Sequence, residues 1–388
     1  MTRVLIWVQH LLGGGHLQRM RLVAEALAAR GAGVHFVTGG VAGPERLPLG
    51  VRVVELPSIK VADATFDPLL DATGRPIDDA FRAARAAALV HAFDAAQPHV
   101  VVLETWPFGR RKFGFEIEPL LSRVATRAPR PRVVASVRDL LQRRDAPAHD
   151  AAVWASARAH LDEILVHGDP AFARLEETFA PAADGTVPVT YTGYVVPGRP
   201  AAVTVPLEAR QGVLVASGSG DVGRDLLAAA IAARPLSAHA ALSWRLLAGP
   251  GMSGDAFEAL VADGRRAGVV VERHRRDYGD LLSRARVSVS QAGYNTVQDV
   301  LAARTPAVLV PFAAAGETEQ AMRAERLAAR GMAEVVAERE LAPAALAAAI
   351  DRAAARGLPP PSPFATDGAE CSAARILALA RDADRALR

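Results

Sequence analysis

Short runs of Val, Leu and Ile alternate with longer Ala-, Arg- and Leu-rich stretches from one end of the chain to the other. The apolar runs are continuous, which is typical of strands buried on both faces of a sheet. A stretch with helical spacing follows each run, so we expect parallel strands joined by crossover helices. The expected strands form two series: 3–8, 34–37, 100–103, 133–137 and 164–166, then 213–216, 244–247, 269–271, 287–290 and 307–310.

The segment 197–210 lies between the two series and contains three prolines and no helical period. We therefore predict an α/β chain with two Rossmann-like, doubly wound domains, the first over 1–196 and the second over 211–365, joined by this linker. A second proline-rich break at 357–363 precedes the C-terminal segment 369–388. Its amphipathic helix is expected to cross back to the first domain.

Composition narrows the function classes. The chain has 388 residues, and Lys+Arg 45 against Asp+Glu 42 leaves a net charge of +3, which argues against a dedicated nucleic-acid-binding protein. The one cysteine, Cys371, excludes an internal disulfide and a Cys-based zinc site, so the cytoplasm is the expected compartment. No apolar run of about 18 residues occurs, which predicts no spanning helix. Peripheral contact with the inner face of the membrane stays open.

The first candidate loop, 13–16, reads Gly-Gly-Gly-His between the first strand and a helix that extends to Gly31. Gly14 and Gly15 let backbone N–H groups point at an anion at the helix start. A tight turn with a solvated histidine is the plainer alternative. His16, however, has a pKa suited to a general base and follows a strand end where open α/β sheets bind ligands.

The second loop, 217–223, opens a helix directly after a strand, and its Gly218, Ser219 and Gly220 begin a G-x-G-x-x-G pattern. A dinucleotide site also needs an acidic residue at the end of the next strand, where the chain has only 246–249, Leu-Leu-Ala-Gly. We therefore interpret the loop as a diphosphate cradle that lacks the ribose half of the dinucleotide fingerprint. A glycine-rich turn without a ligand is the alternative.

The third loop follows the strand 287–290. Gly293 permits a sharp turn, and Asn295 and Thr296 are expected to cap the next helix through their side-chain oxygens. Asp299 lies four residues after Asn295, hence on the same helix face, where it can accept hydrogen bonds from two ribose hydroxyls.

Glu319 and Gln320 begin another helix at the equivalent place after the strand 307–310 and could hold further hydroxyls of the sugar or the ribose. The alternative for Asp299 and Glu319 is that the helix dipole favours carboxylates in first turns.

Four charged residues follow the strands 100–103 and 133–137 at the same edge of the expected sheet: Glu104, Arg110, Arg138 and Asp139. The alternative for Arg138 and Asp139 is that they pair with each other. The aromatic residues around 106–115 are expected to stack on a sugar or to pack in the core. A D-x-D triplet at 382–384 resembles a metal motif but lies on the last helix, so we expect a solvated face and no metal.

The stretch from Val287 to Arg330, with AGYNTVQD, the Pro-Phe turn and ETEQ, resembles the C-terminal domain of glycosyltransferase family 28. The GGGH loop is similar to that family's glycine-rich loop. The segments ETWPFGRR, SVRDLL, VHGDP and YTGYV resemble a bacterial group of predicted glycosyltransferases in the same superfamily.

The resemblance implies a GT-B fold whose C-terminal domain binds a UDP-sugar. It assigns Asp299 to the ribose, Ser219 and Gly220 to the diphosphate, Glu319 with Gln320 to the donor sugar, and His16 to the reacting centre. Two departures leave the sugar's identity open. The family's best-known member has Glu where this chain has Asp299, and the loop after Phe312 differs in length.

We therefore expect a hydroxyl acceptor to attack the sugar with inversion, with His16 as the base and with neither a metal nor a cofactor. The loops after the strands 100–103 and 133–137 are expected to hold this acceptor, and the candidates are Glu104, Arg110, Arg138 and Asp139. A UDP-sugar hydrolase and a sugar-nucleotide epimerase of the same fold remain alternatives within enzymes. An NAD-dependent oxidoreductase is disfavoured by the missing acidic residue after Leu247. A non-catalytic protein that binds nucleotide sugars is the alternative outside enzymes.

Overall fold

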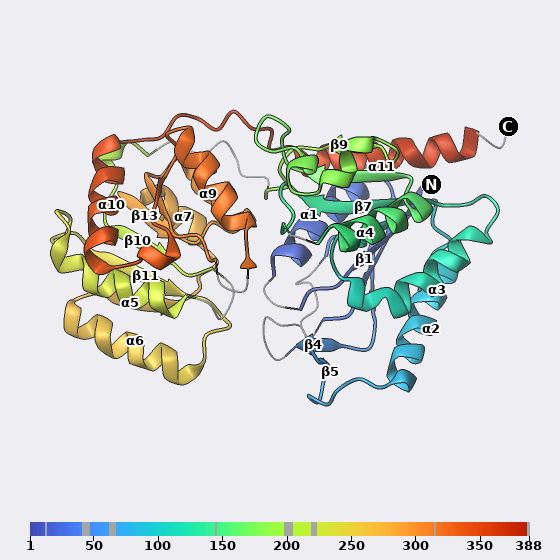
Figure 1. Cartoon of the computed structure of the whole chain (residues 1–388), viewed down its shortest axis with the longest axis horizontal. Helices are drawn as coiled ribbons and strands as arrows, with labels where there is room; N and C mark the ends of the chain where they lie inside the picture. Colours follow the sequence, from blue (N-terminus) through green and yellow to red (C-terminus); the bar gives the residue numbers. More distant parts are fainter. Residues whose placement is uncertain are drawn as a thin grey trace. The chain divides into compact units, whose positions relative to one another are not determined.

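The computed structural model describes the chain except for residues 12–13, 41–46, 62–66, 144–145, 198–204, 219–222, 314–315 and 386–388, and except for the side chains of 383–385. The described chain divides into two compact units (Figure 1). Unit 1 consists of Met1–Pro197 with Phe364–Arg388, and unit 2 of Gly198–Pro363. Half of the predicted linker, residues 198–204, lies outside the described residues, and its end includes the short 3₁₀ helix Leu207–Ala209.

Unit 1 is built on a sheet that has seven strands in the described part of the chain, all parallel. The strands are, in spatial order, β3 (Val51–Glu55), β2 (Gly33–Thr38), β1 (Arg3–Val8), β6 (Val100–Glu104), β7 (Arg132–Arg138), β8 (Glu163–His167) and β9 (Val189–Tyr191). A separate antiparallel pair consists of β4 (Ile59–Val61) and β5 (Leu69–Asp71).

Alternate side chains of these strands supply two cores. One face packs against α1 (Gly15–Ala29) and α11 (Gly368–Arg385), which are in contact with each other. The opposite face packs against α2 (Asp79–Ala96), α3 (Gly114–Ala125) and α4 (Pro147–His160). The C-terminal helix α11 therefore belongs to unit 1, where Ile376 is fully buried.

Unit 2 repeats this plan with a parallel sheet that has six strands among the described residues. Their spatial order is β12 (Val270–Arg273), β11 (Trp244–Ala248), β10 (Val213–Ala216), β13 (Val287–Ser290), β14 (Ala307–Leu309) and β15 (Glu334–Val335). One core contains α5 (Arg224–Ala233), α6 (Gly254–Ala267) and α10 (Pro343–Arg356), and the remaining helices are α7 (Tyr278–Arg284), α8 (Tyr294–Ala303) and α9 (Glu319–Ala329).

The predicted fold class is confirmed, since both units are parallel α/β sheets with crossover helices. Each expected strand is present, with ends that differ by at most two residues. None of the described helices is long and apolar enough to cross a lipid bilayer.

Candidate active site

The strand order of unit 1 reverses between β1 and β6. Successive strands run outward from β1 to β3 on one side and from β6 to β9 on the other. In open α/β sheets, ligands bind at such a switch point, outside the carboxyl ends of the strands. The chain continues from β1 towards His16 at the start of α1, and β6 ends on Glu104. Topology therefore brings these two residues to one sheet edge.

His16 and Glu104 form a hydrogen-bonded pair at this edge. His16 Nδ1 lies 2.6 Å from Glu104 Oε1, and the exposed fractions of the two side chains are 17% and 0%. An ionised carboxylate can only accept hydrogen bonds, so Nδ1 is the protonated ring nitrogen. In the neutral imidazole this leaves Nε2 with a lone pair, and Nε2 is the nitrogen that can accept a proton.

The electrostatics of the pair favour neutral His16 beside ionised Glu104. Burial lowers the pKa of His16 to about 4; Glu104 opposes this shift, while Arg110 and Arg138 add to it. Burial by itself raises the pKa of Glu104, but the hydrogen bond from His16 and the charges of Arg19 and Arg110 hold that pKa well below its usual value. His16 is thus an unprotonated base at neutral pH.

Two further residues hold Glu104 in place, and sequence reasoning missed both. Arg19 Nη2 donates a hydrogen bond of 2.5 Å to Glu104 Oε1, and the Arg19 side chain is 1% exposed. Thr105 Oγ1 donates to the same oxygen, also at 2.5 Å. Arg19 comes three residues after His16 on α1, so helical spacing already places the two on one face.

Arg110 and Arg138 lie at the same edge. Arg110 Nε donates to the backbone oxygen of Gln9, just beyond the end of β1, at 2.8 Å. Glu104 pairs with Ser136 across β6 and β7, and Arg138 follows two residues later, so all three side chains point to the face that α1 covers. Both guanidinium groups are close enough to lower the pKa of His16. These two predicted residues therefore gather around His16.

The segment after β6 has an unusual backbone. Thr105 (φ 65°) and Arg110 (φ 59°) both occupy the left-handed region, although neither is glycine. Such a conformation is a genuine outlier for a β-branched residue, and strain of this kind clusters at functional sites. Here it places the Thr105 hydroxyl on Glu104 and turns the chain so that Arg110 reaches Gln9.

The start of α1 retains free backbone donors in its first turn. Gly14 is the N-cap residue, the helix has no acidic residue in its first turn, and no side chain caps it. A side-chain carbon added at Gly14 would meet no atom within 4 Å, so a ligand can approach the backbone here. Gly15 is the first helical residue, and Gly13 lies outside the described residues.

Two of the expected acceptor residues, Glu104 and Asp139, have fully buried side chains. Their assignment to an acceptor stays a prediction. Glu104 is the last residue of β6 and holds His16. Asp139 accepts hydrogen bonds from the Leu140 backbone (2.9 Å) and the Tyr194 hydroxyl (3.3 Å), which is a structural role.

The aromatic residues of this region divide between core and surface. Trp106 and Phe113 are buried in the core of unit 1, as the packing interpretation predicts, and Phe115 is half-buried. Asp382, from the D-x-D triplet, is exposed on α11.

Unit 2 has its own switch point, between β10 and β13. The loop after β10 turns at Gly218, whose φ of 70° favours glycine. A side-chain carbon at Gly223 would lie 2.3 Å from Ser217 Cβ, so the start of α5 also requires glycine. The predicted diphosphate residues Ser219 and Gly220 lie outside the described residues.

The loop after β13 leads directly into α8. Gly293 is the N-cap residue, and no side chain caps the helix. The expected capping by Asn295 and Thr296 is therefore wrong, because α8 begins at Tyr294 and includes both residues in its first turn. Asn295 and Asp299 are half-buried on one face of α8, as their spacing predicts.

Glu319 and Gln320 begin α9, as expected, but each has an internal contact. Glu319 is 5% exposed, and its Oε2 lies 3.8 Å from Nη2 of Arg323, which in turn donates to the Ala292 backbone at 2.8 Å. Gln320 Oε1 accepts from the Phe312 backbone at 3.2 Å. These contacts connect α9 to the loops after β13 and β14.

Comparison with known proteins agrees with this architecture. Residues 254–367 match the glycosyltransferase family 28 C-terminal domain. Two relatives, from Rhizobium johnstonii and Rhizobium leguminosarum bv. trifolii, are 40% and 39% identical to this chain over 72 residues. Both are named UDP-N-acetylglucosamine--N-acetylmuramyl-(pentapeptide) pyrophosphoryl-undecaprenol N-acetylglucosamine transferase. The match covers 19% of this chain and 19% of each relative, about a fifth of their length.

Solved structures extend the likeness to the whole chain. The calicheamicin glycosyltransferase CalG4 is 18% identical, with a TM-score of 0.56 over 99% of this chain and 97% of its own. TcCGT1 in complex with UDP is 11% identical, with a TM-score of 0.60 over 100% and 96%. MurG from Acinetobacter baumannii is 15% identical, with a TM-score of 0.53 over 98% and 99%.

Two parallel α/β units with this topology define the GT-B fold of glycosyltransferases. Within that fold, residues 254–367, most of them in unit 2, are similar to the family 28 C-terminal domain.

Proposed function

We propose that this protein is an inverting glycosyltransferase that transfers a sugar from a UDP-sugar to a hydroxyl acceptor without a metal ion. The observation that carries the proposal is the His16–Glu104 pair at the switch point of unit 1. The family 28 domain in unit 2 supports a nucleotide sugar as the donor.

The proposed reaction transfers one proton and releases one leaving group. As the acceptor oxygen attacks the anomeric carbon, its proton passes to His16 Nε2, and the bond from that carbon to the diphosphate oxygen breaks. Glu104 stabilises the imidazolium that forms, because its carboxylate accepts the Nδ1 hydrogen bond. Direct displacement from the opposite face inverts the anomeric carbon.

On the donor side, we assign the diphosphate to the loop from Gly218 into α5 and the ribose to Asp299. Backbone N–H groups at a helix start stabilise the charge that develops on a leaving diphosphate. This is the physical basis for proposing that no metal is needed. Glu319 and Gln320 remain our candidates for binding the donor sugar. Both side chains also make internal contacts.

We also propose that the protein is located in the cytoplasm. A single cysteine and no need for disulfides suit the reducing cytoplasm, and peripheral membrane contact at the inner face stays a prediction.

The decisive experiment replaces His16 with Ala and supplies a panel of UDP-sugars with hydroxyl acceptors. We expect turnover to be lost while calorimetry shows unchanged UDP affinity. The matched control is His91→Ala, because His91 is exposed on α2 and should keep full turnover. Turnover by His16→Ala at the parental rate would refute the base assignment.

The same panel separates transfer from hydrolysis and epimerisation. Stoichiometric release of free sugar without acceptor would indicate a hydrolase, because water would then be the nucleophile that His16 activates. Interconversion of UDP-sugars without release of UDP would indicate an epimerase.

A further inference from the structure

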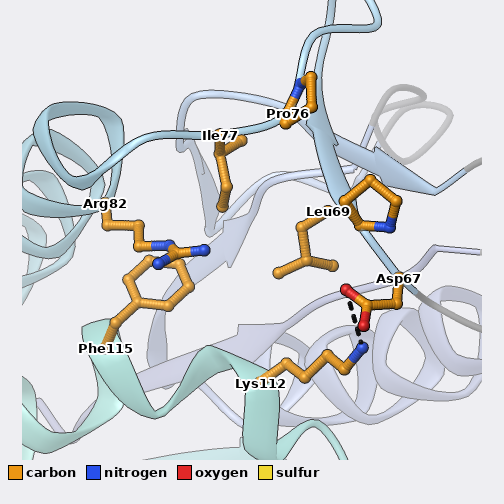
Figure 2. Close-up of a pocket in the computed structure, with 8 residues that line it drawn as sticks. Asp67, Leu69, Pro76, Ile77, Arg82, Lys112 and Phe115 are labelled. Carbon is orange, nitrogen blue, oxygen red and sulfur yellow. Dashed lines mark ion pairs between the residues drawn. The ribbon is translucent and has the colours of Figure 1, made fainter.

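Unit 1 contains a pocket that the proposed chemistry does not use (Figure 2). Its volume is about 390 Å³, within the range of roughly 300–1,000 Å³ typical of small-molecule sites. It lies between β5, the start of α2 and the start of α3. The lining residues are Asp67, Pro68, Leu69, Pro76, Ile77, Arg82, Lys112 and Phe115.

The floor of the pocket is apolar and firmly held. Leu69 and Ile77 are 7% and 8% exposed and belong to the core of unit 1, and Figure 2 shows both pointing into the pocket. The Ile77 backbone N–H donates to the Leu69 oxygen at 3.1 Å, which fixes their separation. Phe115 presents a half-buried ring. These surfaces suit a flat apolar ring.

The rim carries two cations and one carboxylate. Lys112 Nζ lies 3.5 Å from Asp67 Oδ1, with the two side chains 48% and 77% exposed. The Arg82 guanidinium lies 5.9 Å from the centre of the Phe115 ring. Because an exposed ion pair contributes little free energy, a ligand carboxylate can replace Asp67 as the partner of Lys112 at small cost.

One short segment connects the pocket to the His16 edge. Arg110, which influences His16, is separated from Lys112 by a single residue, so their Cα atoms lie within about 7 Å of each other. The Phe113 backbone donates to the Arg110 oxygen at 2.9 Å, which holds the turn between them. The rim residue Lys112 therefore lies close along the chain to a residue that lowers the pKa of His16.

We propose that this pocket binds an anionic acceptor that contains an apolar ring. Lys112 and Arg82 bind the negative group, and the ring is contacted by Leu69, Ile77 and Phe115. The inference rests on the proposed function in one respect, namely that the ligand is the acceptor of the transferred sugar. The ligand class, a flat apolar ring with a carboxylate or similar anion, rests on the pocket itself.

The test uses 6-hydroxy-2-naphthoate and its uncharged counterpart 2-naphthol as probes of the full chain, with binding measured by calorimetry. We expect the parent protein to bind the anionic probe at least threefold more tightly than the neutral one. Ile77→Trp fills the pocket and should weaken binding at least tenfold. Leu49→Trp is the matched control, because Leu49 is fully exposed and should leave binding unchanged.

Two more variants keep the proposal falsifiable if Ile77→Trp fails to fold. Phe115→Ala removes the ring contact without added volume and should weaken both probes. Lys112→Gln should remove the preference for the anionic probe, whereas Arg123→Gln, an exposed residue that pairs with Asp94 on a different part of unit 1, should keep it. Equal binding of both probes to the parent, or parental affinity in folded Phe115→Ala, would overturn the proposal.

Turnover then distinguishes the two proposals. If the anionic probe is glycosylated by the parent and not by Ile77→Trp, the pocket serves the acceptor. If no UDP-sugar supports transfer to any acceptor, yet the variants weaken probe binding as expected, the proposed function fails and the ligand pocket stands. If the probe is glycosylated equally by parent and Ile77→Trp, the pocket is not part of the acceptor site.

Discussion

Replacing Glu104 with Gln tests the central geometry of the candidate site. The amide has nearly the same shape as the carboxylate. Arg19 and Thr105 both donate to Oε1 of Glu104, so the amide oxygen is expected to occupy that position and to accept the Nδ1 hydrogen bond as before. The substitution therefore removes the negative charge beside His16 and leaves the ring orientation intact.

The expected loss follows from the separation of the two groups. Glu104 Oε1 lies 2.6 Å from His16 Nδ1, so the centres of charge of an imidazolium and the carboxylate are about 4 Å apart. At an effective dielectric constant of about 20, this attraction amounts to about 4 kcal/mol. The imidazolium is only partly formed in the transition state, so about 2–4 kcal/mol is lost. That corresponds to a decrease in kcat of about 30- to 1,000-fold.

The assay measures kcat for sugar transfer, UDP affinity and thermal unfolding in the same preparations. Glu163→Gln is the matched control, because Glu163 is also buried and accepts hydrogen bonds from Arg375 at 2.6 and 2.7 Å, on a different strand. Both variants should lose stability, but only Glu104→Gln should lose turnover. A kcat within threefold of the parent for Glu104→Gln would refute the reasoning.

Three further predictions concern pH, the donor and stability. Because the pKa of His16 is depressed to about 4, kcat should be constant from about pH 5 to 8 and decline near pH 4, whereas an acid limb near 6.5 would contradict this. The depressed pKa of His16 also makes the stability of the folded state depend on pH. The contribution of unprotonated His16 is complete above about pH 6.5 and is lost as the pH falls through about 4. The melting temperature of His16→Gln should therefore decrease less over that range than that of the parent. Asp299→Ala should weaken UDP binding about tenfold in calorimetry, since one charged hydrogen-bond acceptor contributes about 1.5 kcal/mol, and unchanged affinity would remove it from the donor site. Arg85→Met leaves Glu116 without its partner in a fully buried ion pair, so urea unfolding should show a loss of about 3–5 kcal/mol, and a loss below about 1 kcal/mol would contradict the pairing.

The central strands could be predicted because their sequences are mostly apolar and their residues are buried on both faces of the sheet. β1, β10 and β13 have the predicted bounds, although β1 begins with Arg3 and β13 alternates Val with Ser. β3 and β15 were not predicted. β3 has no buried residue and is interrupted by Arg52, and β15 has only two residues, so neither forms a longer apolar run.

The candidate site was predictable only in part. His16 could be identified because it follows a glycine-rich loop at a strand end. Its partnership with Glu104, 88 positions away in sequence, depends on β6 lying directly beside β1. Arg19 has no motif of its own, and its role follows from helical spacing only once the position of Glu104 is known.

The sequence by itself determined the parallel α/β class, the two-unit organisation and the positions of the candidate loops, because these follow from local periodicity and from glycine at turns. The tertiary structure decided which charged side chains meet. It buried Glu104 beside His16. It also formed the pocket of unit 1 from segments about 40 residues apart. The physical reason is that pKa values and cavities depend on desolvation and on neighbours across strands, which local sequence does not specify.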